Sequence, residues 1–411
     1  MEIVQDIVIV GAGIAGLTTA LGLHRLGLRS LVLESSDSLR TAGFAFATWT
    51  NAWKALDAIG IGDTLRQQHD QLHGLVAASS VSGLPTSQMS FTSKGIHGNH
   101  EVRCVRRKML IEVLEKELPR GTIRYSSKVV SIEESGHSKL VHLADGSILK
   151  TKVLIGCDGV NSIVAKWLGL QKPAFTGRST IRGYSEFPDG HGFEPKFLQF
   201  FGDGFRNGFL PINSNSIYWF FTWDPSTHYE EDIADTSAKL KQLVLSKLGK
   251  VPEKVRGVVE NTELGSIFST SLRIRWPWDV LKGHIYKGNV CVTGDALHPM
   301  PPDIGQGACS ALEDGVVLAR CLAEAFSSKP GGEAKENIEE EYNRIQKGLE
   351  KFAKERKWRS FELISTAFMV GWIQHSAGKV MNFLRDKWFS TFLAGLLLKR
   401  ADFDCGKLSM F

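Results

Sequence analysis

The sequence predicts an α/β fold in which a parallel sheet, an inserted antiparallel sheet and C-terminal helices share 411 residues. Three observations predict it. Residues 6–34 alternate between buried strand, glycine turn, helix and second strand, as a βαβ unit does. Residues 176–223 alternate aromatic residues and glycines with polar residues, as antiparallel strands with one buried face do. The residues after 326 carry apolar positions at helical spacing.

The pattern in the first half of the chain places each element of the parallel sheet. Buried apolar runs predict strands, apolar residues at helical spacing predict helices, and Asp145-Gly146 predicts a hairpin turn among short strands in 123–156. The strands are expected at 6–10, 30–34 and 152–157, and the helices at 14–26 and 107–118.

The second half first builds the other sheet and then returns to the first one. Aromatic runs at 197–201 and 217–221 predict strands, and residues 213–216 form a turn before the second run. Further on, we expect a surface helix at 236–249, a returning strand at 289–293, a long helix at 307–326 and a break at 329–332.

These elements predict three structural units. The first is discontinuous and binds the cofactor, the second is inserted into it and covers the substrate, and the third is helical. Their expected ranges are 1–75, 102–175 and 285–325 for the first, 76–101 and 176–284 for the second, and 326–411 for the third.

Composition and charge argue against several kinds of partner. The net charge of +5 is modest and the basic residues are scattered, so no nucleic acid is expected. The histidines are dispersed and the six cysteines form no CxxC pair, so no metal site is expected. Reduced thiols in a cytoplasmic protein are the expectation for these cysteines.

Membrane insertion is not expected either. The first strand starts almost at Met1 with no targeting segment before it, and no run of 18 apolar residues occurs. Residues 361–399 contain apolar runs interrupted by charges at 385–387. We interpret them as packed amphipathic helices, with contact to a membrane surface as the alternative.

The strongest local motif is Gly11-Ala12-Gly13-Ile14-Ala15-Gly16, followed by Glu34 after the second strand. Gly11 permits the tight turn, Gly13 lets a pyrophosphate approach the backbone, and Gly16 lets helix and strand pack closely. The helix N-terminus turns its positive end to the phosphates, and Glu34 is placed to accept hydrogen bonds from a ribose. The motif predicts a Rossmann-type dinucleotide site.

Two later motifs distinguish FAD from NAD. Ile155-Gly156-Cys157-Asp158-Gly159-Val160-Asn161-Ser162 resembles the "DG" motif of single-component flavin monooxygenases. Gly294-Asp295-Ala296-Leu297-His298-Pro299, followed by Pro302 and Gly305-Gln306-Gly307, resembles their "GD" motif. The order of the three motifs resembles the flavoprotein aromatic hydroxylases, which include para-hydroxybenzoate and salicylate hydroxylases and zeaxanthin epoxidase. Residues 39–43 and 403–406 resemble the plant, salicylate-hydroxylase-like members.

The resemblance implies a para-hydroxybenzoate-hydroxylase-like fold and assigns roles around the flavin. Asp295 would hold the ribityl chain, and Pro302 would lie beside the ring edge where oxygen adds. Gly305, Gln306, Gly307 and Ala308 open a long helix, whose positive end would face the flavin pyrimidine and stabilise negative charge on it. Pro302 and Gly305 are accordingly the candidate catalytic positions. His298 is expected to be structural.

Three further residues are candidates for FAD contact. Arg107 fits the family arginine that opens a helix after a strand, and Arg40 is a second candidate. Asp158 would lie near the pyrophosphates, although it could equally cap the helix that follows, with Ser162 assisting. The family often has arginine three residues after that serine, whereas this chain has Ala165 and then Lys166. The choice between NADH and NADPH therefore stays open.

The activity that the resemblance implies is oxygenation of a small aromatic or specialised metabolite. NAD(P)H would reduce FAD, O₂ would form a flavin C4a-hydroperoxide, and one oxygen atom would pass to the substrate. Candidate substrate-pocket residues on the second sheet are Arg206, Phe209, Trp219 and Phe221, with packing in the core as the alternative.

Other functions also fit a flavoprotein fold. A non-catalytic carrier, a flavin-dependent halogenase and an oxidase are the alternatives to a monooxygenase. Arg275-Trp276-Pro277-Trp278 does not match the halogenase motif. A monomer or a homodimer is expected.

Overall fold

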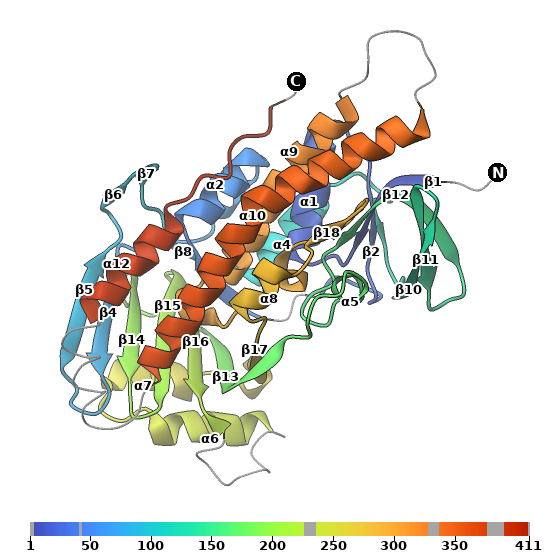
Figure 1. Ribbon diagram of the computed structural model, residues 1–411. Coiled ribbons are helices and arrows are strands. Elements are labelled where there is room, and N and C mark those ends of the chain that lie inside the picture. Colours follow the sequence, from blue (N-terminus) through green and yellow to red (C-terminus); the bar gives the residue numbers. More distant parts are fainter. Residues whose placement is uncertain (1–3, 41–42, 226–235, 328–336, 376–389, 410–411) are drawn as a thin grey trace.

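The computed structural model describes all residues except 1–3, 41–42, 226–235, 328–336, 376–389 and 410–411. Two sheets form its framework, and helices pack on both (Figure 1). The expected break at 329–332 and part of 361–399 lie outside the described residues, as do Thr41 and Ala42.

The first sheet contains the predicted βαβ unit. Parallel pairing of β1 with β2 and β12 puts the ends of these strands along one edge, next to the glycine turn. Its path is β10 (Val129–Ser135), β11 (Ser138–Leu143), β12 (Ile148–Gly156), β1 (Val4–Val10), β2 (Leu31–Leu33) and β9 (Ile123–Arg124). The returning strand β19 (Val290–Val292) pairs with β12 and with β18 (Tyr286–Lys287).

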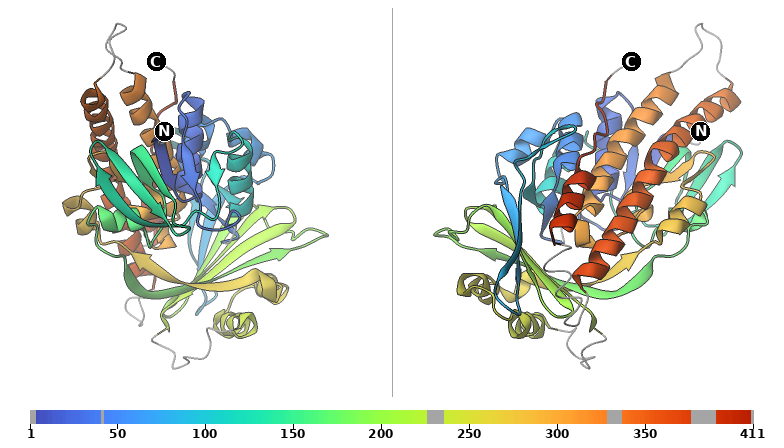
Figure 2. Two further views of the ribbon diagram at one scale, coloured as in Figure 1. Left: turned by 90° about the vertical axis from the view of Figure 1, so that its right-hand side faces the viewer. Right: turned by 60° about the vertical axis from the view of Figure 1, so that its left-hand side comes forward.

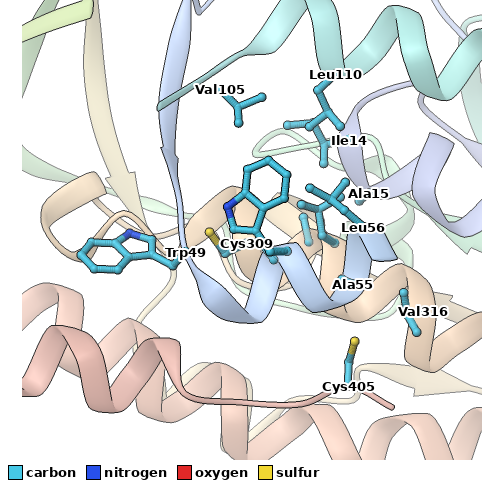
Figure 3. Close-up of a cluster of buried hydrophobic side chains, with 14 of the residues drawn as sticks. Ile14, Ala15, Trp49, Ala55, Leu56, Val105, Leu110, Cys309, Val316 and Cys405 are labelled. Atoms are coloured by element: carbon cyan, nitrogen blue, oxygen red, sulfur yellow. The ribbon is translucent and has the colours of Figure 1, made fainter. Parts of the chain in front are cut away.

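The helices of the first unit pack closely because small residues face one another. In α1 (Ile14–Arg25) every residue from Ile14 to Leu23 is buried, and the helix lies against α9 (Gly307–Ser327). A Cβ at Gly22 would lie 2.8 Å from the Cβ of Ala319. Figure 3 shows Ile14, Leu56 and Val316 among the buried side chains of this core. The other helices here are α2 (Thr50–Ala58), α3 (Gly62–Arg66), α4 (Arg107–Lys116) and α5 (Ile163–Trp167).

The second sheet is mostly antiparallel, as expected, but β14 and β4 run parallel. No hairpin joins these two strands, which lie more than a hundred residues apart, so the connection does not impose antiparallel pairing. The order is β17 (Ile267–Ile274), β13 (Ala174–Glu186), β16 (Ser216–Trp223), β15 (Phe205–Asn213), β14 (Lys196–Phe201), β4 (Gly74–Ser79) and β5 (Pro85–Ser90).

This sheet forms a layer between the first unit and two helices, as the left view of Figure 2 shows. The helices α6 (Ser237–Lys247) and α7 (Glu253–Glu260) cover its outer face, and its inner face is turned to the first unit. Four other strands form two-stranded sheets, in which β3 (Ala45–Thr48) pairs with β8 (Arg103–Arg106) and β6 (Lys94–Gly95) pairs with β7 (Gly98–Asn99).

The C-terminal helices lie along both units. The long α10 (Ile338–Gln374) packs on α9 and on α8 (Pro277–Lys282), and α12 (Ser390–Ala401) reaches β5. Short 3₁₀ turns occupy Leu264–Ser266, Gly294–Ala296 and Pro302–Ile304. Within the described ranges, no helix combines the length and the apolar character needed to cross a bilayer.

Candidate active site

A cavity of about 370 Å³ lies at the carboxyl edge of the first sheet. The glycine turn, Glu34, Arg40, Arg107 and Asp158 line it. The structure therefore brings together the residues that the first and second motifs single out. Ile14 and Ala15 do not line it and are buried in the first turn of α1.

The three glycines of the turn have the geometry that their expected roles require. Gly11 has a φ of +102°, and a Cβ there would lie 2.5 Å from the carbonyl oxygen of Cys157. A Cβ on Gly16 would lie 1.9 Å from the carbonyl oxygen of Gly11. Gly13 has nothing within 4 Å of its Cβ position, and it lines the cavity. Only Gly13 thus leaves open space for a ligand.

Glu34 lies at the end of β2 and is nearly fully buried. One carboxylate oxygen accepts a hydrogen bond from the backbone N–H of Ala12 at 3.0 Å, and the other accepts from that of Ser36 at 2.9 Å. These donors fix the carboxylate at the cavity edge. The guanidinium of Arg40 is 3.7 Å from it and is largely exposed.

Arg107 lines this cavity, whereas Asp295 does not, but the two side chains carry opposite charges and interact electrostatically. Arg107 opens α4, its Nε is buried, and no hydrogen-bond partner for that Nε occurs among the described residues. Burial lowers the pKa of Arg107, while the charge of Asp295 opposes this effect. Asp295 follows β19 and is exposed. An unpaired buried donor beside an open glycine turn fits a phosphate-containing cofactor such as FAD.

Asp158 caps a helix as well as lining the cavity. Its carboxylate accepts hydrogen bonds from the N–H of Ile163 at 2.7 Å and from the hydroxyl of Ser162 at 2.5 Å. The Ser162 oxygen in turn accepts from the N–H of Ala165 at 2.8 Å, at the start of α5. The capping alternative is therefore present in the structure, and contact with FAD stays a proposal.

A second, smaller cavity of about 80 Å³ lies between the inner face of the second sheet and residues 302–305. Pro302 and Gly305 line it, together with Trp49. Gly305 has a φ of +62°, and a Cβ there would lie 2.8 Å from Nε1 of Trp49. A glycine is thus required both by the backbone and by the neighbouring indole.

The residues after Gly305 open α9 at the edge of this cavity. Gln306 is buried, and its side-chain oxygen accepts a hydrogen bond from Asn51 Nδ2 at 2.8 Å. Its own Nε2 has no partner in the described part of the chain. Gly307 and Ala308 form the first turn of the helix, whose positive end favours an anionic group nearby.

Of the four substrate-pocket candidates, only Arg206 lines the cavity. Phe209, Trp219 and Phe221 lie on the opposite face of the sheet, in the core beneath α6 and α7. Side chains alternate between faces along a strand, so the neighbouring residues reach the cavity instead. Those residues are Leu210, Tyr218 and Phe220, with Phe197, Gln199 and Arg182 from adjacent strands.

Sequence reasoning also missed a charged cluster at this cavity, two of whose members, Arg206 and Asp303, line it. The Asp303 carboxylate is fully buried and accepts hydrogen bonds from both terminal nitrogens of Arg178, at 3.0 and 2.8 Å. Arg206 Nη1 lies 3.6 Å from Asp303 and also donates to Gln374. Burial would raise the pKa of Asp303, but the charges of Arg178 and Arg206 outweigh it and lower that pKa.

His375 completes this cluster at the end of α10. Its Nδ1 is 2.8 Å from Arg178 and 2.9 Å from the carbonyl oxygen of Gly371. Burial, aided by the nearby arginines, lowers its pKa to about 3, so the imidazole is neutral at physiological pH. The spacing of residues 178, 206, 303 and 375 gave no local signal, since the fold alone brings them together.

A second buried cluster makes hydrogen bonds to residues of the "GD" motif. His298 Nε2 is 2.6 Å from Asp314, and the same carboxylate accepts from the N–H of Gly294 at 2.9 Å. Arg356 donates to Asp314 at 2.6 Å. His298 is fully buried and lines neither cavity, in agreement with a structural role.

One cavity lies beside the Rossmann-type glycine turn and a second, with several aromatic walls, lies against the second sheet; this pair of sites fits a flavin-dependent oxygenase. Residues 5–353 match the family described as "FAD binding domain". Monooxygenase 2 of Arabidopsis thaliana is 56% identical over 404 residues, covering 98% of each chain, and Monooxygenase 1 of the same plant is 35% identical over 412 residues, covering 98% and 99%. The chain belongs to this family of FAD-dependent monooxygenases.

A solved structure shares the fold. Klebsiella pneumoniae HpxO, in complex with FAD and uric acid, superposes with a TM-score of 0.79 at 22% identity, covering 98% of both chains. The non-catalytic carrier, the halogenase and the oxidase are not favoured by these relatives.

Asp295→Ala should weaken FAD binding without unfolding the protein. The exposed carboxylate supports no core packing, so its loss is expected to remove only the contact to the FAD ribityl chain that the family resemblance implies. A hydrogen bond to a charged group contributes about 1.5–3 kcal/mol, which corresponds to roughly 10- to 100-fold in affinity. Flavin absorbance after desalting measures retention, and circular dichroism checks the fold. Asp295→Asn, which keeps one acceptor oxygen, should lose less FAD than Asp295→Ala. Full retention of FAD by both variants would contradict a role of Asp295 in FAD binding.

Proposed function

We propose that the chain uses NAD(P)H and O₂ to place one oxygen atom into a small aromatic substrate held in the cavity beside residues 302–305. The observation that supports this most is the position of that cavity. Its walls are aromatic, it lies at the N-terminus of α9, and the cofactor cavity lies on the same side of the second sheet.

Bound FAD would supply the redox chemistry, by accepting hydride from NAD(P)H and activating O₂. The chain itself would bind, orient and shield. Trp49, Phe197 and Phe220 present apolar surface that keeps water from the reacting atoms. The N-terminal end of α9 would stabilise negative charge on the cofactor.

The charges at the cavity favour an aromatic compound that carries an anionic group. Arg182 lines the cavity, and its guanidinium makes no hydrogen bond or ion pair with the described residues. Arg206, in contrast, is already committed to Gln374 and Asp303. A free guanidinium in a partly apolar site matches a carboxylate or phenolate. The relatives include an FAD-dependent urate hydroxylase and a 3-amino-4-hydroxybenzoate 2-monooxygenase, whose names fit small polar aromatic substrates.

Two adjacent residues of β16 test this assignment as a matched pair. Phe220 lines the cavity and Phe221 lies in the core on the other face. Phe220→Ala should admit water and lower the ratio of oxygenated product to NAD(P)H consumed. Phe221→Ala should keep the ratio of the unchanged enzyme while losing about 3–5 kcal/mol of stability.

The first measurement screens aromatic carboxylates, phenols and indoles for compounds that speed NAD(P)H oxidation by the enzyme. The second measures how much ¹⁸O the product contains after reaction under ¹⁸O₂. We expect aromatic carboxylates to be favoured over their neutral analogues. An equal effect of both substitutions on the ratio would refute the cavity assignment. Product oxygen derived from water would refute the monooxygenase mechanism.

A further inference from the structure

Seven apolar residues, six of them exposed and Phe361 half-buried, form a surface that the proposed reaction does not use. We call it the aromatic patch: Trp276, Trp278, Trp358, Phe361, Phe368, Met369 and Trp372. Trp278, Trp358 and Trp372 are the most exposed, at 62%, 62% and 64%. Soluble proteins rarely expose large contiguous apolar patches without an interaction to make.

Ring contacts join the two elements of the patch in two places. The ring of Phe361 lies 5.0 Å from that of Trp358 and 5.2 Å from that of Trp278. The rings of Trp276 and Phe368 are also 5.2 Å apart. α8 and α10, which carry these residues, pack side by side in Figure 1. The patch thus joins two elements across one face.

The outward face of α10 changes character along its length. Its first half exposes charged residues such as Glu339, Lys351 and Lys354. From Trp358 onward, the apolar residues 358, 361, 368 and 372 recur at helical spacing on the outward side, with Ser365 between them. The inward side there is also apolar, with Leu363, Ile364 and Ala367 buried. A helix that only covers a core needs one apolar face. The additional apolar face on the outward side therefore indicates that this part of α10 binds a partner.

The charges around the patch are mainly basic. Lys172, Arg273 and Lys282 are exposed beside α8, where Gln171 contacts Arg275 and Phe175 pairs with Arg273. Among the acidic residues nearby, Glu355 and Glu362 are paired with Arg320 and Arg400, and Asp279 is only half-exposed. A basic rim around indole rings matches an anionic bilayer, because tryptophan favours the interface and basic residues favour anionic headgroups.

We propose that the aromatic patch docks this enzyme onto the surface of an anionic lipid bilayer. A bilayer is the better partner for the patch than a second copy of the chain, because a two-fold dimer would bring two basic rims together. The inner side of the same helix turn reaches the active site. A Cβ at Gly371, next to Trp372, would lie 2.4 Å from the Asp303 carboxylate. Docking would therefore place the cavity close to the lipid surface.

Vesicle sedimentation of the FAD-loaded full chain tests the proposal. We compare phosphatidylcholine vesicles with vesicles that contain about 30% phosphatidylserine. The full chain should sediment with the anionic vesicles, and about 0.5 M salt should weaken binding by screening the basic rim. W358Q/W372Q should reduce the partition coefficient at least about tenfold, and R273Q/K282Q should reduce it on anionic vesicles alone.

The matched control is L84Q/I96Q, which removes two exposed apolar residues outside the patch. It should bind vesicles as the unchanged chain does. All variants should keep their flavin content and their activity in buffer, because none of these side chains lines a cavity. Equal vesicle binding by W358Q/W372Q and the control would overturn the proposal. So would the absence of vesicle binding together with a dimer that W358Q/W372Q dissociates, since that result assigns the patch to a second copy.

Discussion

Gly13→Val is expected to give a folded protein that contains no FAD. The Cβ position of Gly13 has no protein atom within 4 Å and faces the cofactor cavity. Its backbone is not in the left-handed region, so valine adds no strain there. The two methyl groups would instead occupy the place of a pyrophosphate at the N-terminus of α1. We expect FAD affinity to fall on the order of 100-fold or more, as a direct clash with the ligand does.

Flavin absorbance after desalting measures the loss, and thermal unfolding without added FAD checks that the apoprotein still folds. Gly257→Val is the control, because Gly257 also has nothing within 4 Å of its Cβ position but lies in α7. It should keep its flavin. Stoichiometric FAD in Gly13→Val would show that the glycine turn does not bind the pyrophosphate.

The fold could be predicted from the sequence where local rules are strong. The glycine turn, the acid at the end of β2 and the hairpin at Asp145-Gly146 each carry their own backbone requirement, and the structure has them as expected. Apolar runs placed β1, β12 and β19, because strands buried on both faces are continuously apolar.

The substrate cavity could not be predicted in the same way, for a reason of register. In β16, residues 217–221 are all apolar, so the pattern does not tell which face is turned to the core. A shift by one residue exchanges the two faces. Only the packing of α6 and α7 on the outer face decides that Tyr218 and Phe220, and not Trp219, reach the cavity.

The charged clusters were beyond sequence reasoning because they join residues far apart in the chain. Asp303 meets Arg178 and His375 only when the two sheets and α10 have assembled. A single arginine or histidine in a strand or helix carries no sign of its partner. The same holds for Arg356, which lies in an otherwise ordinary stretch of helix.

Arg356→Met is expected to cause a large loss of stability together with loss of FAD. The guanidinium is fully buried and lies 2.6 Å from both Glu313 and Asp314. Methionine fills a similar volume but leaves two buried carboxylates with less positive charge beside them, which costs about 3–5 kcal/mol of stability. Because Asp314 also holds the N–H of Gly294 and His298, the loop that carries Asp295 should loosen as well.

The pH dependence follows from the direction of the pKa shifts. Burial raises the pKa values of Glu313 and Asp314, but the arginines, and His298 at Asp314, outweigh it and lower both. Such carboxylates stabilise the folded state above their unfolded pKa, and that stability is lost as pH falls through the folded value. Without Arg356 both pKa values should rise. As pH falls, the two carboxylates of the variant should then take up protons before those of the unchanged enzyme do. The difference in unfolding free energy between the two proteins should therefore be largest near neutral pH and shrink below about pH 5.

Denaturant unfolding at several pH values, with flavin release followed in parallel, checks both parts of this expectation. The control is Lys354→Met on the same helix, whose exposed ion pair with Glu350 spans one turn. Its loss should leave the stability almost unchanged, because solvent screens such pairs, and should leave the flavin content unchanged. If Arg356→Met were as stable as that control at neutral pH, the buried cluster would not be what holds the loop of Gly294 and Asp295 in place. Flavin released well before global unfolding, in contrast, would locate the weakness in that loop.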